Sequence, residues 1–542
     1  MTNLFSEKVL INDSYGWLKI DENGLTLWFK GYLIDSNAQN LHSEVVNILK
    51  ENAFQLNILS KLSQKLNGHF AFILISSNSI FASVDKVNTI PLFYSANADN
   101  FFLSNKASLI RNKNPNDKIN HQASLEIAMS GYTIGRKTLY KDLFQLTSGE
   151  CIFFDKNAYE IDIYYTYSPW KVIHRKKSEL KKDFNSILNL TMEELVDSIN
   201  GRQVIVPLSA GYDSRLVASG LKHFGVDNVF CISYGRKGNF ESKMASLIAN
   251  KLGYKFKHID INDNTKKIFF KSTIYKDYVD YFDSYSSIPA VQDIAEICYI
   301  KEKKLISDDA IIINGNSGDY ISGAHLFKPK SLNKTLDNNW QKFLLKHFAL
   351  WSKLNTPHNH SLIEEQLVKM SKSRKIIDFL ENGDSPLFFE ALEYLGRQSM
   401  YVVNQQEAYD FNQYDWRLPL WSDNFLNFWE GVPYDYKLGQ KLYSEVLFEN
   451  NWGGVWKAIP VNKKTIHPNW IVPLRFMAKL FLAPLGKSYW HSFERNVFEY
   501  WMDVTRNSVM TPYHKVLFDR NGQRNTISWI SKEYLKQKNI II

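Results

Sequence analysis

The sequence QVIVPLSAGYDSR occupies residues 203–215, and it decides how most of the chain is expected to fold. Its first six residues, 203–208, are mainly apolar and partly β-branched, which is typical of a short buried strand. Small residues follow, and a helical pattern begins near Ser214 and runs to Phe224. A helix that starts directly after a strand offers unpaired N–H groups and the positive end of its dipole to a phosphate. The stretch therefore predicts a strand, a phosphate-binding turn and a helix.

Strands and helices continue to alternate after this stretch. Residues 228–234, 257–261 and 310–313 have the apolar character of buried strands, whereas residues 242–252 have a helical pattern. Such alternation is typical of a parallel sheet that is covered by helices. Helical patterns and loops dominate the rest of the chain. We therefore expect an α/β domain over residues 178–542, built on a parallel sheet and ending in a helical part.

The N-terminal region has a different pattern, in which short apolar segments alternate with turns. Two helices are expected, at residues 42–50 and 55–66. Strands are expected at residues 24–31, 70–75, 79–84, 149–154 and 161–165. This pattern predicts an α+β sandwich as a first domain over residues 1–170. The basic residues 174–177 are interpreted as a solvated linker to the second domain, with an anion-binding patch as the alternative.

The side chains of the turn suit a magnesium-bound phosphate chain. Ser209 and Ser214 can donate hydroxyl hydrogen bonds, and the small residues Ala210 and Gly211 let the backbone approach a ligand closely. Asp213 is unsuited to direct contact with phosphate, but it can hold Mg²⁺ against it. The alternative interpretation is a strand, a turn and a helix with a Ser or Asp cap.

A second loop, INGNSGDY at residues 313–320, also follows a buried strand. Gly315 lies where a backbone would approach a ligand, and Asp319 supplies a second carboxylate. Two carboxylates from separate loops can hold Mg²⁺ on a leaving pyrophosphate and leave positions for phosphate oxygens and water. By itself this loop would be interpreted as a turn with an Asx cap.

The first loop resembles the S-G-G-x-D-S pyrophosphate loop of ATP pyrophosphatases, with Ala210 in place of one glycine. The second resembles the S-G-E-G-S-D segment of asparagine synthetases, in which Asp319 matches the aspartate and Asn316 replaces the glutamate. The resemblance implies ATP and Mg²⁺ as cofactors, with Leu208 and Ser233 on the adenine side. It leaves the acceptor open, because Asn316 departs from the pattern.

Two later segments resemble the same family. Residues 414–420 (YDWRLPL) resemble its E-x-R-x-P-F segment, and residues 459–464 (IPVNKK) resemble the segment that carries a lysine beside the phosphates. The resemblance implies that Lys464, or Lys463 beside it, stabilises the charge that grows on pyrophosphate during adenylation. An ordinary surface lysine pair is the alternative. Arg236 is likewise either a contact to phosphate or substrate, or a solvated side chain.

The first domain resembles the glutaminase domain of asparagine synthetases. Residues 67–72 (NGHFAF), Asp85 and residues 91–94 (PLFY) match its N-G-x-F-A-F, R-D and P-L-Y-Y segments at this spacing. Working glutaminases carry a cysteine directly after the initiator Met, where this sequence has Thr2, and no cysteine precedes Cys151. We therefore expect an Ntn-hydrolase-like domain that has lost glutaminase activity, followed by a PP-loop synthetase domain.

Composition narrows the cellular setting. The chain has 542 residues and a net charge of +9, and its scattered basic residues argue against nucleic-acid binding. Three cysteines without a CxxC pair, no signal peptide and no long apolar run indicate a cytoplasmic protein without a transmembrane segment. Residues 469–486 are apolar with interspersed Arg475 and Lys479. We interpret them as a docked C-terminal helix, with peripheral contact to a membrane surface as the alternative.

These observations predict an ATP-dependent, AMP-forming carbon–nitrogen ligase. A small-molecule carboxylate would be adenylated with release of pyrophosphate, and ammonia or an amine would then displace AMP. Amidation of a sugar acid in surface-polysaccharide assembly is the favoured reaction. The alternatives are asparagine formation from aspartate, peptide or β-lactam-type ring closure, and a non-catalytic ATP-binding module. A homodimer would fit the resemblance, since the family often forms dimers.

Overall fold

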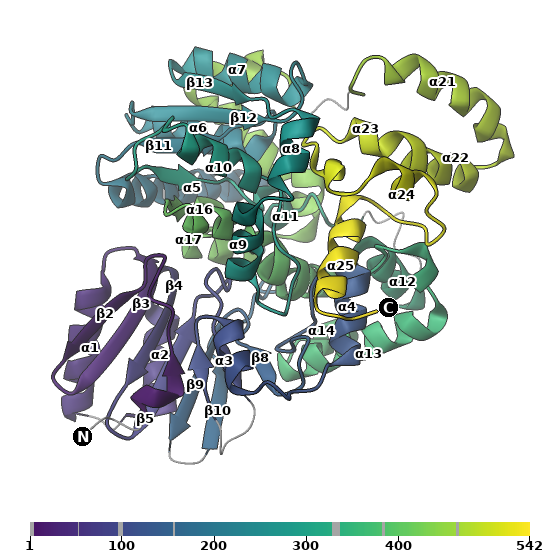
Figure 1. Cartoon of the computed structure of the whole chain (residues 1–542). Coiled ribbons are helices and arrows are strands. Elements are labelled where there is room, and N and C mark those ends of the chain that lie inside the picture. Colours follow the sequence, from purple (N-terminus) through teal and green to yellow (C-terminus); the bar gives the residue numbers. More distant parts are fainter. Residues whose placement is uncertain are drawn as a thin grey trace.

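The computed structural model describes residues 5–51, 54–95, 101–155, 158–327, 336–381, 385–461 and 466–541. Figure 1 shows the sheets of the N-terminal part at the lower left and a second sheet with its helices above them. The C-terminal helices lie on the right-hand side of this view. Together these elements confirm the mixed α/β architecture expected from the sequence.

The N-terminal part contains two packed sheets. The six-stranded sheet has the order β10-β9-β5-β4-β3-β2, and every neighbouring pair in it is antiparallel. The smaller sheet has the order β1-β7-β6-β8. In chain order the strands are β1 (Val9–Leu10), β2 (Leu18–Glu22), β3 (Leu25–Leu33), β4 (Gly68–Ile75), β5 (Ser79–Val84), β6 (Phe93–Ser95), β7 (Leu103–Ser104), β8 (Leu143–Gln145), β9 (Glu150–Asp155) and β10 (Ala158–Ile163).

Side chains of the six-stranded sheet alternate between two cores, as the period of two in a strand requires. In β4, Ala71 belongs to the core shared with the smaller sheet. Phe70 and Phe72 instead pack in the core that contains α1 (Ala38–Glu51) and α2 (Leu56–Lys65). The layers are therefore a pair of helices, a sheet and a second sheet, which agrees with the expected sandwich.

The expected helices and strands of this part are present, with one displacement. The strand expected at residues 161–165 instead covers Ala158–Ile163. The reason is its pairing with β9, in which Ala158 lies opposite Asp155 and Ile163 lies opposite Glu150. Pairing with a neighbour, which the apolar pattern does not report, therefore fixes the ends of this strand.

The second part of the chain is built on a parallel sheet with the order β13-β12-β11-β14-β15. Its central strand, β11, has β12 on one side and β14 on the other. The carboxyl end of a parallel sheet at such a reversal of strand order is where open α/β folds bind ligands. The strands are β11 (Val204–Pro207), β12 (Val229–Tyr234), β13 (Lys255–Ile259), β14 (Ile311–Ile313) and β15 (Asp415–Arg417).

The order of elements around this sheet confirms the expected alternation. α5 (Lys177–Ile199) precedes β11, α6 (Tyr212–His223) joins β11 to β12, and α7 (Phe240–Leu252) joins β12 to β13. β15 was not expected, because a strand of three residues gives no measurable periodicity. It lies within residues 414–420, which resemble the E-x-R-x-P-F segment. It pairs with β14, so that Arg417 lies opposite Ile313.

Helices make up most of the remaining described chain. None of the helices in the described ranges is both long and apolar enough to cross a bilayer. They are α3 (Ala107–Lys113), α4 (His121–Ser130), α8 (Asp263–Phe269), α9 (Thr273–Phe282), α10 (Ile294–Glu302), α11 (Gly318–Ile321), α12 (Leu336–His347), α13 (Pro357–Ser373), α14 (Ile377–Glu381), α15 (Ser385–Glu393), the π-helix η4 (Tyr394–Val402), α16 (Glu407–Phe411), α17 (Asp423–Glu430), α18 (Tyr434–Lys437), α19 (Lys441–Asn450), α20 (Val455–Ala458), α21 (Ile471–Leu482), α22 (Lys487–Glu494), the π-helix η10 (Arg495–Glu499), α23 (Tyr500–Met502), α24 (Tyr513–Leu517) and α25 (Thr526–Gln537).

One expectation for the C-terminal part is wrong. The apolar stretch at residues 469–486 does form a helix, α21, but this helix is not docked into the protein core. Of its side chains only Ile471 is fully buried. Among the described residues, α21 packs mainly on the short neighbouring helix α22 and the segment after it, and its apolar side chains remain largely exposed.

Candidate nucleotide and substrate cavity

A cavity of about 670 Å³ opens at the carboxyl ends of β11 and β14. Four segments supply most of its wall: the loop after β11, the loop after β14, the π-helix η4 and the segment after α23. Among the residues predicted for the site, five line this cavity, and they come from both loops. They are Ser209, Asp213, Ser214, Gly315 and Asp319.

Hydrogen bonds inside the first loop hold its two serines together. The Ser209 and Ser214 hydroxyl oxygens lie 2.9 Å apart, and the Ser209 N–H donates to the Ser214 hydroxyl at 3.0 Å. The Gly211 N–H donates to the Ser209 hydroxyl at 3.1 Å. Gly211 is also the N-cap of α6, so the loop is closed directly at the positive end of the helix dipole.

Three other predicted contacts lie behind the cavity wall. Leu208, Ala210 and Ser233 are all buried, and none of them lines the cavity. The Ala210 N–H donates to the Glu241 carboxylate at 2.7 Å, and the Ser233 hydroxyl lies 3.2 Å from the His258 ring. The Ala210 N–H and the Ser233 hydroxyl are therefore already bound by protein groups. None of the three residues lies at the surface that a ligand would touch.

The two predicted carboxylates meet beside the start of α6. The Asp319 N–H donates to one carboxylate oxygen of Asp213 at 2.9 Å, and the Tyr443 hydroxyl donates to the other at 2.9 Å. Burial, together with the negative charge of Asp319, raises the pKa of Asp213 to about 8. A bound cation would relieve this repulsion, so the pair has the character of a cation-binding site.

Glycines make this close approach possible. A Cβ atom on Gly318 would lie 2.6 Å from an oxygen of the Asp213 carboxylate. A Cβ atom on Gly315 would lie 2.8 Å from the backbone carbonyl carbon of Asp213. Both distances are far below van der Waals contact, so the second loop can lie against the first turn of α6 only with glycine at these positions.

A histidine that the sequence did not single out links the carboxylate pair to a second acidic group. His325 lies 3.4 Å from the Asp319 carboxylate and hydrogen-bonds Glu393 through its other ring nitrogen. Burial would lower the pKa of His325, but these two carboxylates raise it to about 9. Lys346 and His347 also contact Glu393, at 3.1 and 3.2 Å. Glu393 is therefore surrounded by cationic or ionisable partners that keep it charged.

Side-chain amides form the wall opposite the carboxylates. Asn316 donates to Gln405 at 2.7 Å, and Gln405 donates to Gln292 at 2.5 Å. Asn316 stands where the resemblance has a glutamate, so here a neutral amide chain replaces a charge. Arg397 lines the same cavity from the π-helix η4 and has no ion pair among the described residues. π-helical turns often occur at functional sites.

Lys463 and Lys464 lie outside the described residues. The segment that leads to them is fixed to α6 by a buried arginine. Arg215 donates to the backbone carbonyls of Ile459 and Pro460, each at 2.8 Å, and to that of Ala210 at 3.0 Å. No sequence pattern predicted this role, because Ile459 and Pro460 are 244 and 245 positions away from Arg215.

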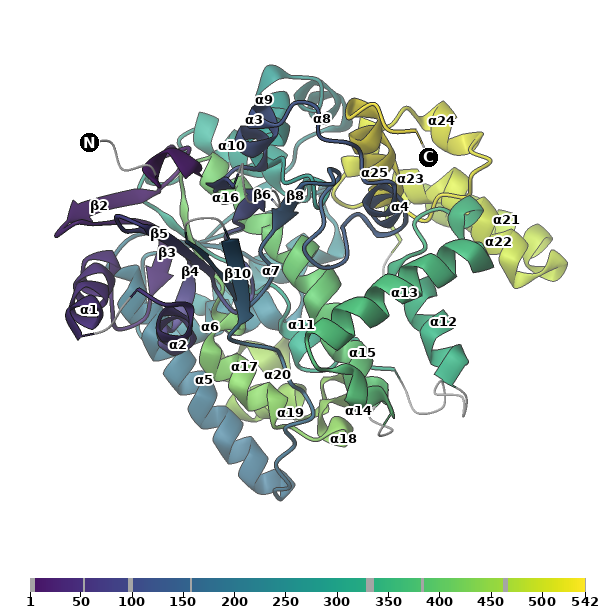
Figure 2. The same cartoon turned by 90° about the horizontal axis from the view of Figure 1, so that it is seen from below.

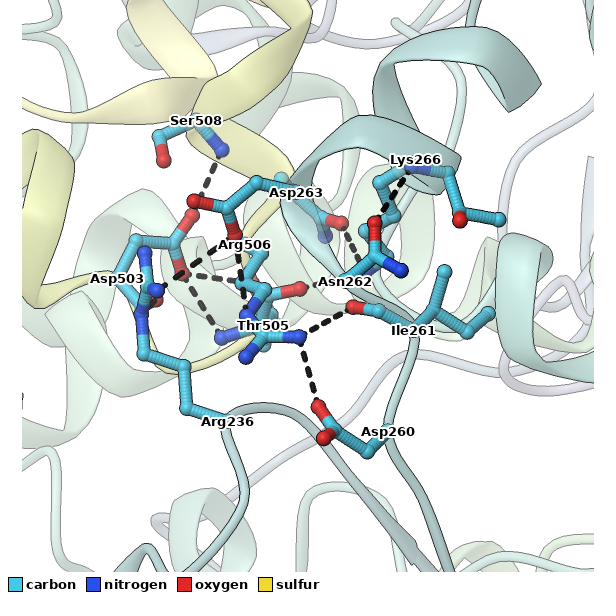
Figure 3. Close-up of polar contacts among 12 residues, drawn as sticks. Arg236, Asp260, Ile261, Asn262, Asp263, Lys266, Asp503, Thr505, Arg506 and Ser508 are labelled. Atoms are coloured by element: carbon cyan, nitrogen blue, oxygen red, sulfur yellow. Dashed lines mark hydrogen bonds and ion pairs between the residues drawn. The ribbon is translucent and has the colours of Figure 1, made fainter.

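The segment after α23 closes another side of the cavity. Asp503, Thr505 and Asn507 line the wall. Figure 3 shows the contacts that hold them, in which Arg236 donates to the Asp503 carbonyl at 3.1 Å and Arg506 pairs with Asp260 at 2.7 Å. Arg236 is largely buried and bound by protein groups, so it is not the solvated side chain that was one of the two expectations from the sequence.

Comparison with known proteins finds partial matches to this chain. A family model described as a glutamine amidotransferase domain matches residues 19–165. The microcin J25-processing protein McjC of Escherichia coli is 22% identical over 307 residues, covering 56% of this chain and 55% of that protein. A putative glutamine-hydrolyzing asparagine synthetase 2 of Methanocaldococcus jannaschii is 24% identical over 258 residues, covering 44% and 48%. The chain thus spans about half the length of these relatives.

Among solved structures, the allosteric regulatory enzyme of purine biosynthesis is similar in part. It is 12% identical, with 44% of this chain and 62% of that chain covered and a TM-score of 0.16. That score is too low to compare the folds in detail. The amidotransferase match, the two relatives and the two loops quoted above nevertheless agree with one another, and together they support an asparagine synthetase-family protein.

Proposed function

We propose that this protein binds MgATP in the cavity, adenylates a substrate carboxylate, and then forms an amide. The observation that carries the proposal is the meeting of Asp213 and Asp319 beside the start of α6, joined by a 2.9 Å hydrogen bond. A helix N-terminus favours phosphate, and paired carboxylates favour the cation that accompanies it. The position, at the carboxyl end of the central strand, is the one where open α/β sheets bind nucleotides.

Each loop residue has a role in this proposal. Ser209, Gly211 and Ser214 would cradle the pyrophosphate portion of ATP, in the manner of a PP-loop. Asp213 and Asp319 would hold Mg²⁺. Magnesium is commonly bound by one or two carboxylates together with phosphate oxygens and water, which fits a pair rather than a larger protein cage. Within the described ranges no group of three or more His, Cys, Asp or Glu forms a metal site. The bound ion would offset charge on the phosphates.

The proposed reaction has two steps. A carboxylate oxygen of the substrate attacks the α-phosphorus of ATP, the bond to the β-phosphate oxygen breaks, and an acyl-adenylate and pyrophosphate form. The nitrogen of ammonia or an amine then attacks the acyl carbon, the bond to the AMP oxygen breaks, and the nitrogen loses a proton. Lys464, or Lys463, would stabilise the charge on the departing pyrophosphate.

We propose that the nitrogen does not come from glutamine hydrolysed by this chain. Cys151 is the one cysteine in the stretch that the amidotransferase model matches. Its side chain is fully buried, and burial raises the pKa of the thiol to about 12. A thiol with that pKa forms almost no thiolate at neutral pH, so it cannot serve as a nucleophile.

Three substrate classes remain in the proposal. A sugar acid fits a cavity that is lined by side-chain amides and by the unpaired Arg397, since such groups bind hydroxyls and carboxylates. A peptide carboxylate, closed onto an amine, is the second candidate. The similarity to a microcin-processing protein favours it. Asparagine formation from free aspartate is the third reaction to be tested.

The test is carboxylate-dependent ATP–pyrophosphate exchange by the purified chain with Mg²⁺. The panel contains aspartate, nucleotide-linked uronic acids and peptides with side-chain carboxylates. We expect exchange with one class, and trapping of its acyl-adenylate by hydroxylamine. If ATP binds but no carboxylate supports exchange, a non-catalytic ATP-binding module is the better account. If ATP does not bind, the proposed site is wrong.

A further inference from the structure

Helices α21 and α22 form an arm at the margin of the molecule. Figures 1 and 2, which are related by a quarter turn, both show the two helices at the right-hand edge. We call the stretch from Trp470 to Glu494 the C-terminal arm. Ile471 and Trp490 of the arm form a small core with Phe498 of the following segment, with partly buried neighbours around them. The arm thus packs on itself and on the segment that follows it rather than on the central sheets.

The outer surface of this arm is unusually apolar. Nine of the eighteen exposed large hydrophobic side chains in the described ranges fall within twenty residues, and they are between 43% and 72% exposed. Scattered apolar residues are normal on a protein surface, but a gathered set marks an interaction site. The nine residues are Trp470, Val472, Leu474, Phe476, Met477, Leu480, Phe481, Leu485 and Tyr489.

The charged residues of the arm are cationic except for its last residue, Glu494. The sequence contains no Asp or Glu between Glu449 and Glu494, although it contains six Lys and Arg in that interval, four of them in the described ranges. The Arg475 guanidinium pairs with Glu494 and lies over the Trp490 ring. Lys479 and Lys487 are exposed and form no ion pair among the described residues. Unpaired cations therefore accompany the apolar side chains.

This combination identifies the kind of surface that would cover the arm. A second copy of the same arm would bring its own cations against Lys479 and Lys487, which electrostatic repulsion disfavours. An anionic lipid surface would accept the apolar side chains and pair with the lysines at the same time. Trp470 and Tyr489 are amphipathic aromatic residues of the type enriched at the headgroup level of membranes.

We propose that the C-terminal arm binds the surface of an anionic lipid bilayer, with α21 lying in the plane of the interface. α21 has 12 residues, whereas a spanning helix needs about 20, so insertion parallel to the surface is the geometry that fits. The inference is independent of the proposed reaction, because none of the nine exposed residues lines the cavity. Lipid binding would bring the protein to substrates held at a membrane.

The test is flotation of the purified chain, without ATP, on vesicles. One set contains phosphatidylcholine alone and the other contains phosphatidylcholine mixed with phosphatidylglycerol. We expect binding to the anionic vesicles that weakens as salt is added. The double variant Phe476→Ser/Phe481→Ser should bind at least about tenfold more weakly, since two apolar rings would no longer leave water on binding. The double variant Lys479→Glu/Lys487→Glu should lose the preference for anionic lipid.

Phe518→Ser is the matched control, because Phe518 is 75% exposed but lies outside the arm. It should bind vesicles like the unchanged chain. The proposal is overturned if the unchanged chain ignores anionic vesicles or if the Phe476→Ser/Phe481→Ser variant binds them equally well. Sedimentation velocity tests whether a second copy of the chain covers the arm instead. That result would be an oligomer that Phe476→Ser/Phe481→Ser dissociates, in a protein that does not bind vesicles. Circular dichroism spectra check that each variant is folded.

Discussion

The two halves of this protein resemble one family through short motifs, but the side chains in these segments have opposite environments: buried in the first half and exposed to a cavity in the second. In the N-terminal half, His69 is buried, with its ring between the Tyr32 hydroxyl at 2.7 Å and the Trp421 carbonyl at 3.3 Å. In the second half, the Asp319 side chain is 51% exposed and lines an open cavity. Protein groups satisfy the first residue, whereas the second retains the capacity to bind a ligand.

The same contrast holds for the conspicuous aspartates of each half. Asp85 is fully buried and accepts hydrogen bonds from the backbone N–H groups of Phe70, Val87 and Thr89. Asp213 faces the cavity and the negative charge of Asp319. A buried carboxylate that is fully hydrogen-bonded orders a loop, whereas two facing carboxylates favour a cation. We therefore propose that Asp85 stabilises the fold of one half, whereas Asp213 and Asp319 bind a ligand in the other.

The largest effect should follow from changing Asp213→Asn. The amide preserves the shape of the side chain but removes the charge that would hold Mg²⁺, so we expect ATP–pyrophosphate exchange to fall by about 100-fold or more. The fold should persist, because the amide oxygen can still accept a hydrogen bond. Asp227→Asn, at a side chain that is 82% exposed, is the matched control and should leave exchange unchanged. Near-normal exchange in Asp213→Asn would place the metal site elsewhere.

The next largest effect is expected on the free energy of unfolding, when a buried contact between the two halves is removed. Arg374 follows α13 and is buried against Glu150 of the N-terminal part at 2.8 Å, and it also donates to the Ser148 carbonyl at 2.8 Å. Glu150 keeps Arg136 as a partner at 2.9 Å, so Arg374→Met removes one of its two cations and leaves the buried Ser148 carbonyl without this donor. We expect the free energy of unfolding to fall by about 2–3 kcal/mol. Urea unfolding followed by circular dichroism measures this change.

An exposed pair beside Arg374 supplies the control. Lys369 and Glu365 lie 2.6 Å apart on α13, with side chains more than half exposed. Lys369→Met should therefore change the free energy of unfolding by less than about 1 kcal/mol. Equal losses from Arg374→Met and Lys369→Met would mean that the buried pair does not couple the two halves.

A smaller effect should appear in the pH dependence of stability. Burial lowers the pKa of His69 to about 3, so the folded protein keeps this ring neutral while the unfolded chain binds a proton below about pH 6.5. Stability from this residue is complete above pH 6.5 and is lost as the pH falls towards 3. Between pH 7 and pH 5 the loss should be about 2 kcal/mol. In His69→Gln, urea unfolding should show a correspondingly weaker dependence on pH, whereas an unchanged dependence would contradict the buried neutral ring.

The smallest effect is expected at Cys151. Its buried thiol should resist iodoacetamide at pH 8 in the folded protein and react after unfolding in urea, as mass spectrometry can show. Cys151→Ala should retain ATP–pyrophosphate exchange within about twofold, since the residue is far from the adenylation chemistry in the proposed account. Rapid alkylation of the folded chain would instead reopen a nucleophilic role in the N-terminal half.

Local patterns explain which features could be predicted from the sequence. β11, the turn at Ser209 and helix α6 follow from adjacent residues, and both cavity loops carry short, recognisable motifs. β15 escaped prediction because its three residues become a strand only through pairing with β14. The exposure of α21 escaped prediction because an apolar helix has the same sequence pattern whether or not a partner covers it.

Long-range contacts account for the remaining differences at the site. His325 and Glu393 are 68 positions apart, and Arg236 meets Asp503 across 267 positions. No periodicity or spacing connects such residues before the chain folds. Ala210 and Ser233 occupy positions where the resemblance predicts nucleotide contacts, yet the Ala210 N–H and the Ser233 hydroxyl contact Glu241 and His258, respectively. A motif therefore located the cavity but did not identify all of the side chains that line it.

We propose that the cavity between the two loops is the MgATP site, and a crystal structure with Mg²⁺ and a non-hydrolysable ATP analogue would test this site. We expect phosphate density at the start of α6, against Ser209 and Ser214, with a cation beside Asp213 and Asp319. Nucleotide bound elsewhere, or a cavity that stays free of nucleotide at saturating concentration, would contradict it.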